Sequence, residues 1–177
     1  NDRAGEVGRT LNVKDFDLNR LFAAEGVQIL HLSGLIAALS PETSNFCLEL
    51  ARAAKKHGTG ISFDLNYRAT FWLNREKELS AAFAEIASLS DILVGNEEDF
   101  QLCLGIKGPE EGGKDLASKI DSFKEMISRV KKSFPGASVF GTTLRQVIST
   151  NEHLWGAIML EGENWHVVEP REIHVLD

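Results

Sequence analysis

The sequence predicts an α/β fold with three αβα layers around a mostly parallel sheet, and three observations support this prediction. Short apolar runs alternate with helical patterns from about residue 15 onward, as in βαβ units. The segments between these runs are long enough for crossover helices. The chain has 177 residues, of which 43% are hydrophobic, and this suits one domain with a buried core. We therefore expect ligands at the carboxyl ends of the strands, where parallel sheets bind them.

The first strand is expected directly after a helix. A helix over residues 15–25 ends at Gly26, and the apolar run 27–32 follows as the first strand. Ser33 and Gly34 then end this strand, so the chain leaves the sheet there.

The second helix has the clearest start and end signals. Residues 40–42, Ser-Pro-Glu, supply an N-cap, a proline at the first helical position and an acidic first turn. Lys55 and Lys56 complement the C-terminal end of the helix dipole, and Gly58 ends the helix. The apolar run 61–65 is the second predicted strand.

The second half of the chain repeats this pattern. An apolar stripe over residues 79–86 predicts a helix, residues 92–94 predict a short strand, and Asn96 caps a helix to about residue 104. Residues 107–115 contain three glycines, one proline and five charged residues, so we expect a surface loop there.

The longest amphipathic helix is expected over residues 116–134, where apolar residues recur in steps of three and four. A strand over residues 137–144 follows. Residues 153–168 alternate well enough for a β-hairpin, with its turn at residues 161–164. The prediction is therefore a parallel sheet followed by a C-terminal hairpin.

Charge and composition disfavour several classes of protein. The chain has 19 basic and 26 acidic residues and a net charge of −7, the wrong sign for binding nucleic acid or anionic membranes. No apolar stretch approaches the roughly 18 residues of a membrane span, and no signal-peptide pattern opens the chain. Cys47 and Cys103 lie in helical patterns, so we expect no disulfide framework and a cytoplasmic location. Small molecules are the expected partners.

The two ends of the sequence do not resemble natural termini. The chain begins with Asn1 rather than methionine, and it stops at Asp177 within an apparent strand-to-loop passage. We therefore expect the central part of one longer domain.

Polar residues follow the second predicted strand at alternate positions. Asp64, Asn66 and Arg68 place a carboxylate, an amide and a guanidinium where the chain leaves the sheet. Arg suits bidentate contact with a carboxylate or a phosphate. The alternative is a loop held by its own hydrogen bonds. We also expect Asp64 to pair with Arg68, which would lower the pKa of Asp64 and make it a poor base.

The third predicted strand is followed by Asn-Glu-Glu-Asp at residues 96–99. Asn96 and the acidic residues suit a helix N-terminus with no further role. Alternatively, Asn96 and Asp99 share one side of the first turn and hold a phosphate with the water shell of Mg²⁺. The residues leave both interpretations open.

No other motif points to a site. The five histidines show no metal-ligand spacing, and we expect no structural metal. The dinucleotide fingerprint, the P-loop and the G-x-S-x-G elbow are missing from the sequence. Trp72, Trp155 and Trp165 are expected to be packing residues.

Taken together and in this order, these segments resemble the phosphofructokinase-B or ribokinase-like carbohydrate kinases, and among them the 2-keto-3-deoxygluconate kinases. The similar segments are residues 2–5, 31–34, 39–42, 63–68 with Trp72, 95–99 and 141–145. The resemblance covers nearly the whole chain. It implies that residues 1–177 are the central part of one ribokinase-like domain, with residues 1–14 returning from the lid.

The resemblance also implies roles for the candidate site residues. Arg3 and Arg68 would bind the substrate, and Arg68 would act near the transferred phosphate. Asp99 would position Mg²⁺. The residues implied in binding the ATP cofactor are Asp64, Asn66, Asn96, Thr143 and Arg145.

Three departures from the family pattern matter. Asp99 stands where the family has Glu, so any metal contact is expected through water or after a shift of the helix. Residues 143–149 lack the glycine of many nucleotide loops. The family's G-A-G-D anion hole and catalytic Asp base have no match within residues 1–177, and we expect them beyond Asp177.

We therefore predict part of a kinase that transfers the γ-phosphoryl group of ATP to 2-keto-3-deoxygluconate or a similar sugar acid. Residues 1–177 alone are expected to be inactive, because the catalytic base is not among them, and a homo-oligomer is expected. The alternatives are a sugar-acid or nucleotide-binding module without turnover, another sugar specificity in the same family, and a purely structural domain.

Overall fold

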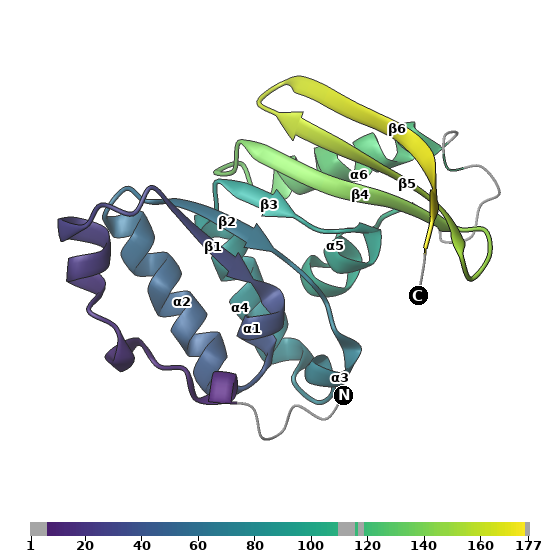
Figure 1. Cartoon of the computed structure of the whole chain (residues 1–177). Helices are drawn as coiled ribbons and strands as arrows, with labels where there is room; N and C mark the ends of the chain where they lie inside the picture. The colour runs from purple at the N-terminus through teal and green to yellow at the C-terminus, as the bar shows by residue number, and fades with distance from the viewer. Residues whose placement is uncertain (1–6, 110–115, 117–118, 176–177) are drawn as a thin grey trace.

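The computed structural model describes residues 7–109, 116 and 119–175, and its centre is a mixed six-stranded sheet in the order β1-β2-β3-β4-β5-β6 (Figure 1). Strands β1 to β4 pair in parallel, and β4 to β6 pair antiparallel. The strands are β1 (Ile29–Ser33), β2 (Gly60–Asp64), β3 (Ile92–Val94), β4 (Val139–Val147), β5 (Glu152–Glu161) and β6 (Asn164–His174). This confirms the predicted three-layer α/β class.

The strands lie close to their predicted ranges. β3 matches the prediction, β2 begins one residue early, and β1 is displaced towards the C-terminus of the predicted range. The turn between β5 and β6, at Gly162 and Glu163, lies within the predicted residues 161–164. The hairpin is longer than predicted, because β6 continues to His174, and it extends the parallel sheet through β4.

The longer helices of the described residues were all predicted. They are α2 (Pro41–Lys56), α4 (Glu76–Leu89), α5 (Glu97–Leu104) and α6 (Ile120–Ser133). A reciprocal capping box begins α2: Ser40 Oγ accepts the N–H of Thr43 at 3.2 Å, and Thr43 Oγ1 accepts the N–H of Ser40 at 3.0 Å. The predicted cap at Ser40 is therefore confirmed.

Short helical turns complete the connections. They are η1 (Val7–Thr10), η2 (Val13–Asp15), η3 (Arg20–Ala24), α1 (Gly34–Ala38) and α3 (Ala69–Trp72). The turns α1 and α3 were not predicted, because a segment of so few residues is too short for a helical repeat to be recognised. At Gly34, a Cβ atom would lie 2.0 Å from the carbonyl oxygen of Leu65. Glycine therefore allows the turn after β1 to pack on the loop after β2.

The helix predicted over residues 15–25 is confirmed only in part: residues 18–24 are helical, and most of them form a π-helical turn rather than a regular α-helix. This region contains the end of a 3-10 turn and then the π-helical turn η3, in which the N–H of Glu25 donates to the carbonyl oxygen of Arg20 at 2.8 Å. Phe22 is the buried residue of η3. Leu18 and Leu21 also pack against the core, so apolar contacts hold this short helical segment against the rest of the molecule.

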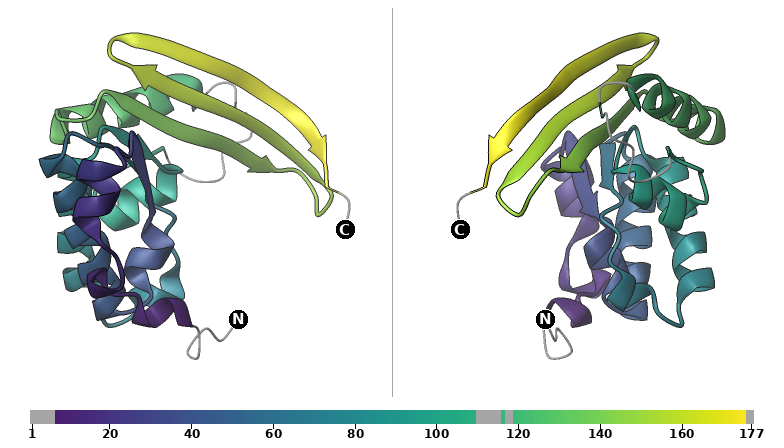
Figure 2. Two further views of the ribbon diagram at one scale, coloured as in Figure 1. Left: turned by 60° about the vertical axis from the view of Figure 1, so that its left-hand side comes forward. Right: turned by 90° about the vertical axis from the view of Figure 1, so that its right-hand side faces the viewer.

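The helices pack on the sheet in the same order as they occur along the chain. Helix α2 packs against β1 and β2, α4 packs against β2, and α6 packs against β4 and β5. Alternate residues of the central strands form the core and are fully buried, among them Ile61, Phe63, Leu93 and Phe140. Figure 2 shows that the antiparallel strands β4, β5 and β6 extend beyond the helices as a curved ribbon.

Both cysteines are free thiols in the core. Burial raises the pKa of Cys47 to about 12, so this thiol stays protonated at neutral pH. No helix in the described part of the chain combines the length and the hydrophobicity that crossing a membrane requires. The cytoplasmic location and the homo-oligomeric state stay predictions.

Candidate functional site

The carboxyl ends of β1, β2 and β3 meet at one edge of the sheet. Ser33, Asp64 and Val94 are register partners across these strands. Asp64 is the last residue of β2, and Asn96 follows β3 as the N-cap of α5. The structure thus brings the segment after β2 and the turn after β3 together.

Asp99 joins these two segments. One carboxylate oxygen accepts the backbone N–H of Tyr67 and the other accepts the backbone N–H of Asn96, both at 2.8 Å. Asn96 Oδ1 in turn accepts the N–H of Asp99 at 2.8 Å, which completes a capping box. Asp99 is only 7% exposed. The capping role of Asn96 is confirmed, and Asp99 holds the loop after β2 against the first turn of α5.

A residue with left-handed backbone conformation turns the chain after β2. Asn66 has φ 41°, which asparagine tolerates better than most residues. Its Nδ2 donates to Ser33 Oγ at 3.1 Å. Tyr67 packs on Trp72 with ring centroids 5.3 Å apart, and Trp72 packs edge-on against Phe83 at 4.9 Å. Hydrogen bonds and aromatic contacts therefore fix this loop.

Arg68 leaves the loop at an exposed position. Its Nη1 donates to the carbonyl oxygen of Tyr67 at 2.6 Å. The ion pairs found among the described residues do not include one between Arg68 and Asp64. The expected pairing of these two side chains is therefore wrong, because the guanidinium turns to the backbone and to solvent.

The expected direction of the Asp64 pKa shift is also wrong. Burial raises the pKa of the half-buried Asp64 carboxyl above its ordinary value, and the neighbouring Asp99 carboxylate raises it further. His31, a hydrogen bond from the Asn66 backbone and Arg68 act in the opposite direction but do not compensate. Desolvation and like charge thus outweigh the exposed guanidinium, and Asp64 is a stronger base than the predicted pair implied.

Replacing Asp64 with asparagine is expected to raise the melting temperature at pH 7 by roughly 1–3 °C, allowing for solvent screening of a half-exposed carboxylate. The pKa of Asp64 is higher in the folded chain than in the unfolded chain, so the folded chain binds the proton more tightly. Wild-type stability is therefore regained as the pH falls from neutral through the folded-state pKa. The advantage of the variant should shrink over that interval, which calorimetry at several pH values would measure.

Asp121→Asn is the matched control, because the Asp121 side chain is 94% exposed. Its effect should be small and should not follow the same pH dependence. An Asp64→Asn variant that is less stable than wild type at pH 7 would contradict the raised pKa.

A pocket of about 320 Å³ lies between the first turn of α5 and strands β4 and β5. Gly141 of β4 pairs with Val94, so Thr143 and Arg145 follow at alternate positions on the same face of the sheet. The residues that line the pocket are Asn96, Glu97, Glu98, Thr143, Arg145, Val147 and Trp155. Its oxygen donors suit Mg²⁺, and its guanidinium suits a phosphate.

The three tryptophans differ in position. Trp72 is 3% exposed, which confirms its packing role. Trp155 is 42% exposed and lines the pocket, so its predicted packing role is wrong. The reason is that Trp155 lies on the face of β5 that carries the pocket, directly opposite Arg145. Trp165 packs against the edge of the core.

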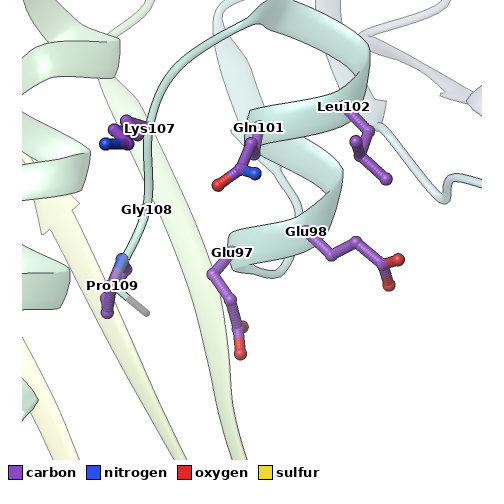
Figure 3. A pocket seen from close by; sticks show the side chains of 7 residues that line it. All are labelled: Glu97, Glu98, Gln101, Leu102, Lys107, Gly108 and Pro109. Carbon is purple, nitrogen blue, oxygen red and sulfur yellow. The ribbon is translucent and has the colours of Figure 1, made fainter. Parts of the chain in front are cut away.

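A second pocket, of about 400 Å³, adjoins the same turn of α5 (Figure 3). Glu97 and Glu98 line both pockets. Across from α5, residues 107–109 line the second pocket. The carbonyl oxygen of Lys107 accepts a hydrogen bond of 2.6 Å from Arg129 Nη2. These three residues form the loop that was predicted, and residues 110–115 of that loop lie outside the described residues.

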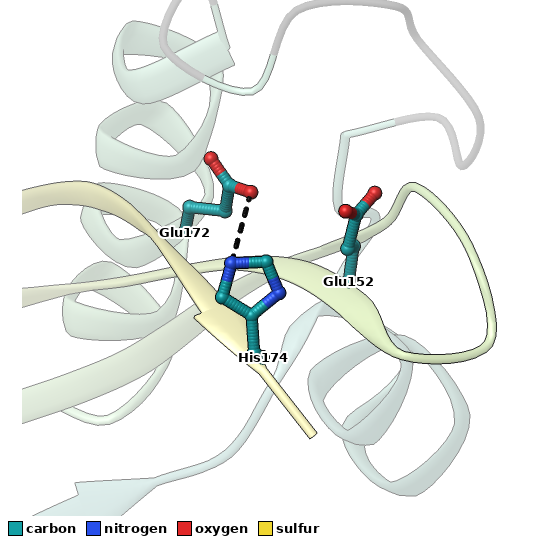
Figure 4. A group of neighbouring side chains, drawn as sticks. All are labelled: Glu152, Glu172 and His174. Atoms are coloured by element: carbon teal, nitrogen blue, oxygen red, sulfur yellow. Dashed lines mark ion pairs between the residues drawn. The ribbon is translucent and has the colours of Figure 1, made fainter. Parts of the chain in front are cut away.

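A mixed group of carboxylates and an imidazole lies at the end of the β5–β6 hairpin (Figure 4). Glu152 pairs with His174 across the strands, and Glu172 lies two positions before His174. The ligand atoms of all three lie within 4.8 Å of one another, and Glu172 and His174 form an ion pair at 3.5 Å. Sequence spacing does not reveal this group, because its members come from two strands. Glu172 and His174 are exposed, and none of the three lines either pocket, so we assign no role to them.

The structure gathers most of the predicted site residues but not all of them. Asn96, Thr143 and Arg145 line one pocket, while Arg68 is not among its lining residues. Arg3 lies outside the described residues. Sequence reasoning missed His153 and Trp155, whose positions beside Arg145 depend on the pairing of β4 with β5.

Three comparisons with known proteins identify the family and support the fold. A family model described as "pfkB family carbohydrate kinase" matches residues 9–147. The 5-dehydro-2-deoxygluconokinase of Clostridium tetani (strain Massachusetts / E88) is 30% identical over 141 residues, which cover 78% of this chain and 40% of that protein. The crystal structure of 2-dehydro-3-deoxygluconokinase from Thermotoga maritima has a TM-score of 0.81 at 26% identity, covering 96% of this chain and 48% of that one.

A sugar kinase from Pyrococcus horikoshii, solved in complex with ATP, shares the fold with a TM-score of 0.60 at 15% identity, covering 94% of this chain and 43% of that one. The chain thus spans less than half the length of each of these proteins. The range of the family match contains the candidate residues from Asp64 to Arg145 and ends before His153.

Proposed function

The chain belongs to the pfkB family of carbohydrate kinases, and from this membership we propose that it is part of a kinase for a keto sugar acid. The reaction would transfer the γ-phosphoryl group of ATP to a hydroxyl group of 2-keto-3-deoxygluconate or a similar acid. The names of the similar proteins from Clostridium tetani and Thermotoga maritima support an acid of this type. The Pyrococcus horikoshii kinase supports ATP as the donor.

One observation carries this proposal: two arginines lie on two sides of the first turn of α5. Arg68 follows the loop that Asp99 attaches to this turn, and Arg145 lines the pocket between the turn and β4. The phosphates of the donor and the carboxylate of the acceptor are both anionic, so each needs a cation to bind it. A cation beside the transferred phosphoryl group also stabilises the charge that develops on it in the transition state.

We assign the two sides of the turn to the two substrates. The sugar acid would lie on the β2 side, where Arg68 offers a fork suited to its carboxylate or to the transferred phosphoryl group, with Arg3 as a further contact. The nucleotide would lie on the β4 side, against Asn96, Thr143 and Arg145. Roles for Asp64 and Asn66 in binding the cofactor stay predictions.

The donor set of the pocket fits Mg²⁺. Glu97 and Glu98 supply carboxylates and Asn96 an amide, and these hard oxygen donors are the ones Mg²⁺ prefers. Both oxygens of Asp99 already accept backbone N–H groups, so we propose that Asp99 acts on the ion through water. Bound Mg²⁺ would neutralise phosphate charge, while the residues of this chain hold the two substrates in line.

Residues 1–177 by themselves are expected to give no turnover. By resemblance, the catalytic Asp base belongs to a G-A-G-D segment that these residues do not contain. The test is formation of ADP from ATP with Mg²⁺ and each acid, 2-keto-3-deoxygluconate or 5-keto-2-deoxygluconate. A polypeptide that continues past Asp177 into a G-A-G-D segment should turn over one of the two.

Turnover by residues 1–177 that Asp64→Asn abolishes would contradict this prediction and assign the base to Asp64. Binding of both ligands without turnover by the longer polypeptide would instead favour a non-catalytic binding module. Activity on a neutral sugar alone would point to another specificity within the family.

A further inference from the structure

The pairing of β4 with β5 surrounds Arg145 with two residues that lie eight and ten positions further along the chain. Arg145 is the register partner of Trp155, and His153 is the partner of Val147. Residues paired in this way lie on the same face of the sheet, and diagonal neighbours on that face are close enough for long side chains to touch. Arg145 Nη2 accordingly lies 3.2 Å from His153 Nδ1.

The contact with Arg145 defines the role of His153 Nδ1. A guanidinium has only donors, so in this hydrogen bond Nδ1 of His153 is the acceptor. His153 is 8% exposed, so packing fixes the ring and water competes little for its acceptor. His153 can therefore hold the guanidinium in one orientation.

Trp155 contacts Arg145 in a second way. The guanidinium carbon lies 5.7 Å from the centroid of the indole ring, within the range of a cation–π interaction. The ring is partly exposed and lines the pocket. It therefore stabilises the cation at the pocket wall without neutralising its charge.

The partners of Arg145 are neutral, which distinguishes it from the three arginines that pair with glutamates. Three arginines form ion pairs with glutamates: Arg20 with Glu25, Arg52 with Glu85 and Arg75 with Glu78. Within residues 7–109, 116 and 119–175, no ion pair of Arg145 with a carboxylate is found at 4.0 Å or less. The guanidinium is thus fixed in place while its charge stays available to an anion.

We propose that His153 and Trp155 are positioning residues that hold the guanidinium of Arg145 towards the phosphate groups of the nucleotide. This inference rests on the proposed kinase function. It adds two residues beyond the range of the family match, which ends at residue 147. Their contribution is to reduce the rotamer freedom that a long, flexible arginine would otherwise lose on binding.

The test is binding of the non-hydrolysable β,γ-imido analogue of ATP, with Mg²⁺, to residues 1–177 by titration calorimetry. Arg145→Met should raise Kd about tenfold, the scale of one lost charge-assisted contact. His153→Leu should raise Kd roughly three- to tenfold, because the guanidinium is no longer held. In the Arg145→Met background, His153→Leu should have no further effect, which a merely structural role would not produce.

Two further variants act as rescue and control. His153→Asn should retain most of the affinity, because asparagine keeps a hydrogen-bond acceptor near the position of Nδ1. His166→Leu is the matched control, since this exposed histidine of β6 pairs with Glu161 and does not line the pocket. Thermal melts followed by circular dichroism establish that each variant is folded. If His153→Leu does not fold, Trp155→Leu with and without Arg145→Met gives the same comparison.

The outcomes separate this inference from the function on which it rests. If wild type binds the analogue and His153→Leu binds it within twofold of wild type, the positioning role is overturned and the nucleotide site stands. The same conclusion follows if His153→Leu weakens binding equally with and without Arg145. If wild type does not bind the analogue, the proposed nucleotide site is overturned together with the positioning role.

Discussion

Replacing Arg68 with alanine, in a full-length kinase that contains this chain, is expected to lower kcat/KM for the sugar acid about 100-fold, the scale for losing one electrostatic contact in a transition state. The loop that carries Arg68 is fixed by the bond from Tyr67 to Asp99 and by the packing of Tyr67 on Trp72. The guanidinium is therefore presented at the sheet edge by a rigid support, and its removal leaves the anionic acceptor without that cation.

Arg68→Lys should recover only part of this loss, because an ammonium group cannot make the bidentate contact of a guanidinium. Arg52→Ala is the matched control, since Arg52 is also exposed but pairs with Glu85 between α2 and α4. Steady-state kinetics with ATP and the sugar acid would measure all three variants. An Arg68→Ala enzyme within threefold of wild type would remove Arg68 from the proposed site.

Replacing Asp99 with alanine is expected to destabilise the chain by about 3 kcal/mol, because two partly buried backbone N–H groups lose an acceptor whose side chain is itself buried. These are the N–H groups of Tyr67 and Asn96, each 2.8 Å from an Asp99 oxygen. For a domain of this size, the loss corresponds to a fall in melting temperature of roughly 6–12 °C. Asp99→Asn should be intermediate, because the amide keeps one acceptor oxygen.

The chain supplies its own control for this effect. Asp15 closes a third capping box, in which its carboxylate accepts the backbone N–H of Asn12 at 3.2 Å in an exposed turn. Water can replace that acceptor, so Asp15→Ala should cost less than about 1 kcal/mol. Equal melting temperatures for the Asp15→Ala and Asp99→Ala variants would show that Asp99 does not join the two loops.

The sequence predicted the parallel sheet well, because local patterns carry that information. Ser40, Pro41 and Gly58 mark the two ends of α2 by backbone chemistry that acts within one turn. The apolar run over residues 92–94 was predicted as a strand, and β3 has these same bounds. The helix predicted over residues 15–25 is shorter in the structure and largely π-helical, and its sequence pattern did not indicate this difference.

The sequence also indicated where a site would lie. Parallel strands place their carboxyl ends at one edge, so the sequence alone predicts Asp64, Asn66, Arg68 and Asn96 at that edge. Chain direction and strand order are enough for that inference. The residues at this edge are part of the resemblance to the carbohydrate kinases, and the match of the family model over residues 9–147 confirms the family.

Side-chain partners could not be read from the sequence, because each depends on distances between residues far apart in the chain. Arg68 was expected to lower the pKa of Asp64, yet burial and the carboxylate of Asp99, 35 positions away, raise it. Trp155 looked like a core residue until the pairing of β4 with β5 placed it beside Arg145 at the pocket. The sequence by itself thus determined the fold class, the family and the sheet edge at which we propose the site, since these follow from local periodicity and motif order. Only the tertiary structure decided which charges are paired, buried or available to a ligand, since desolvation and Coulomb interactions act through space.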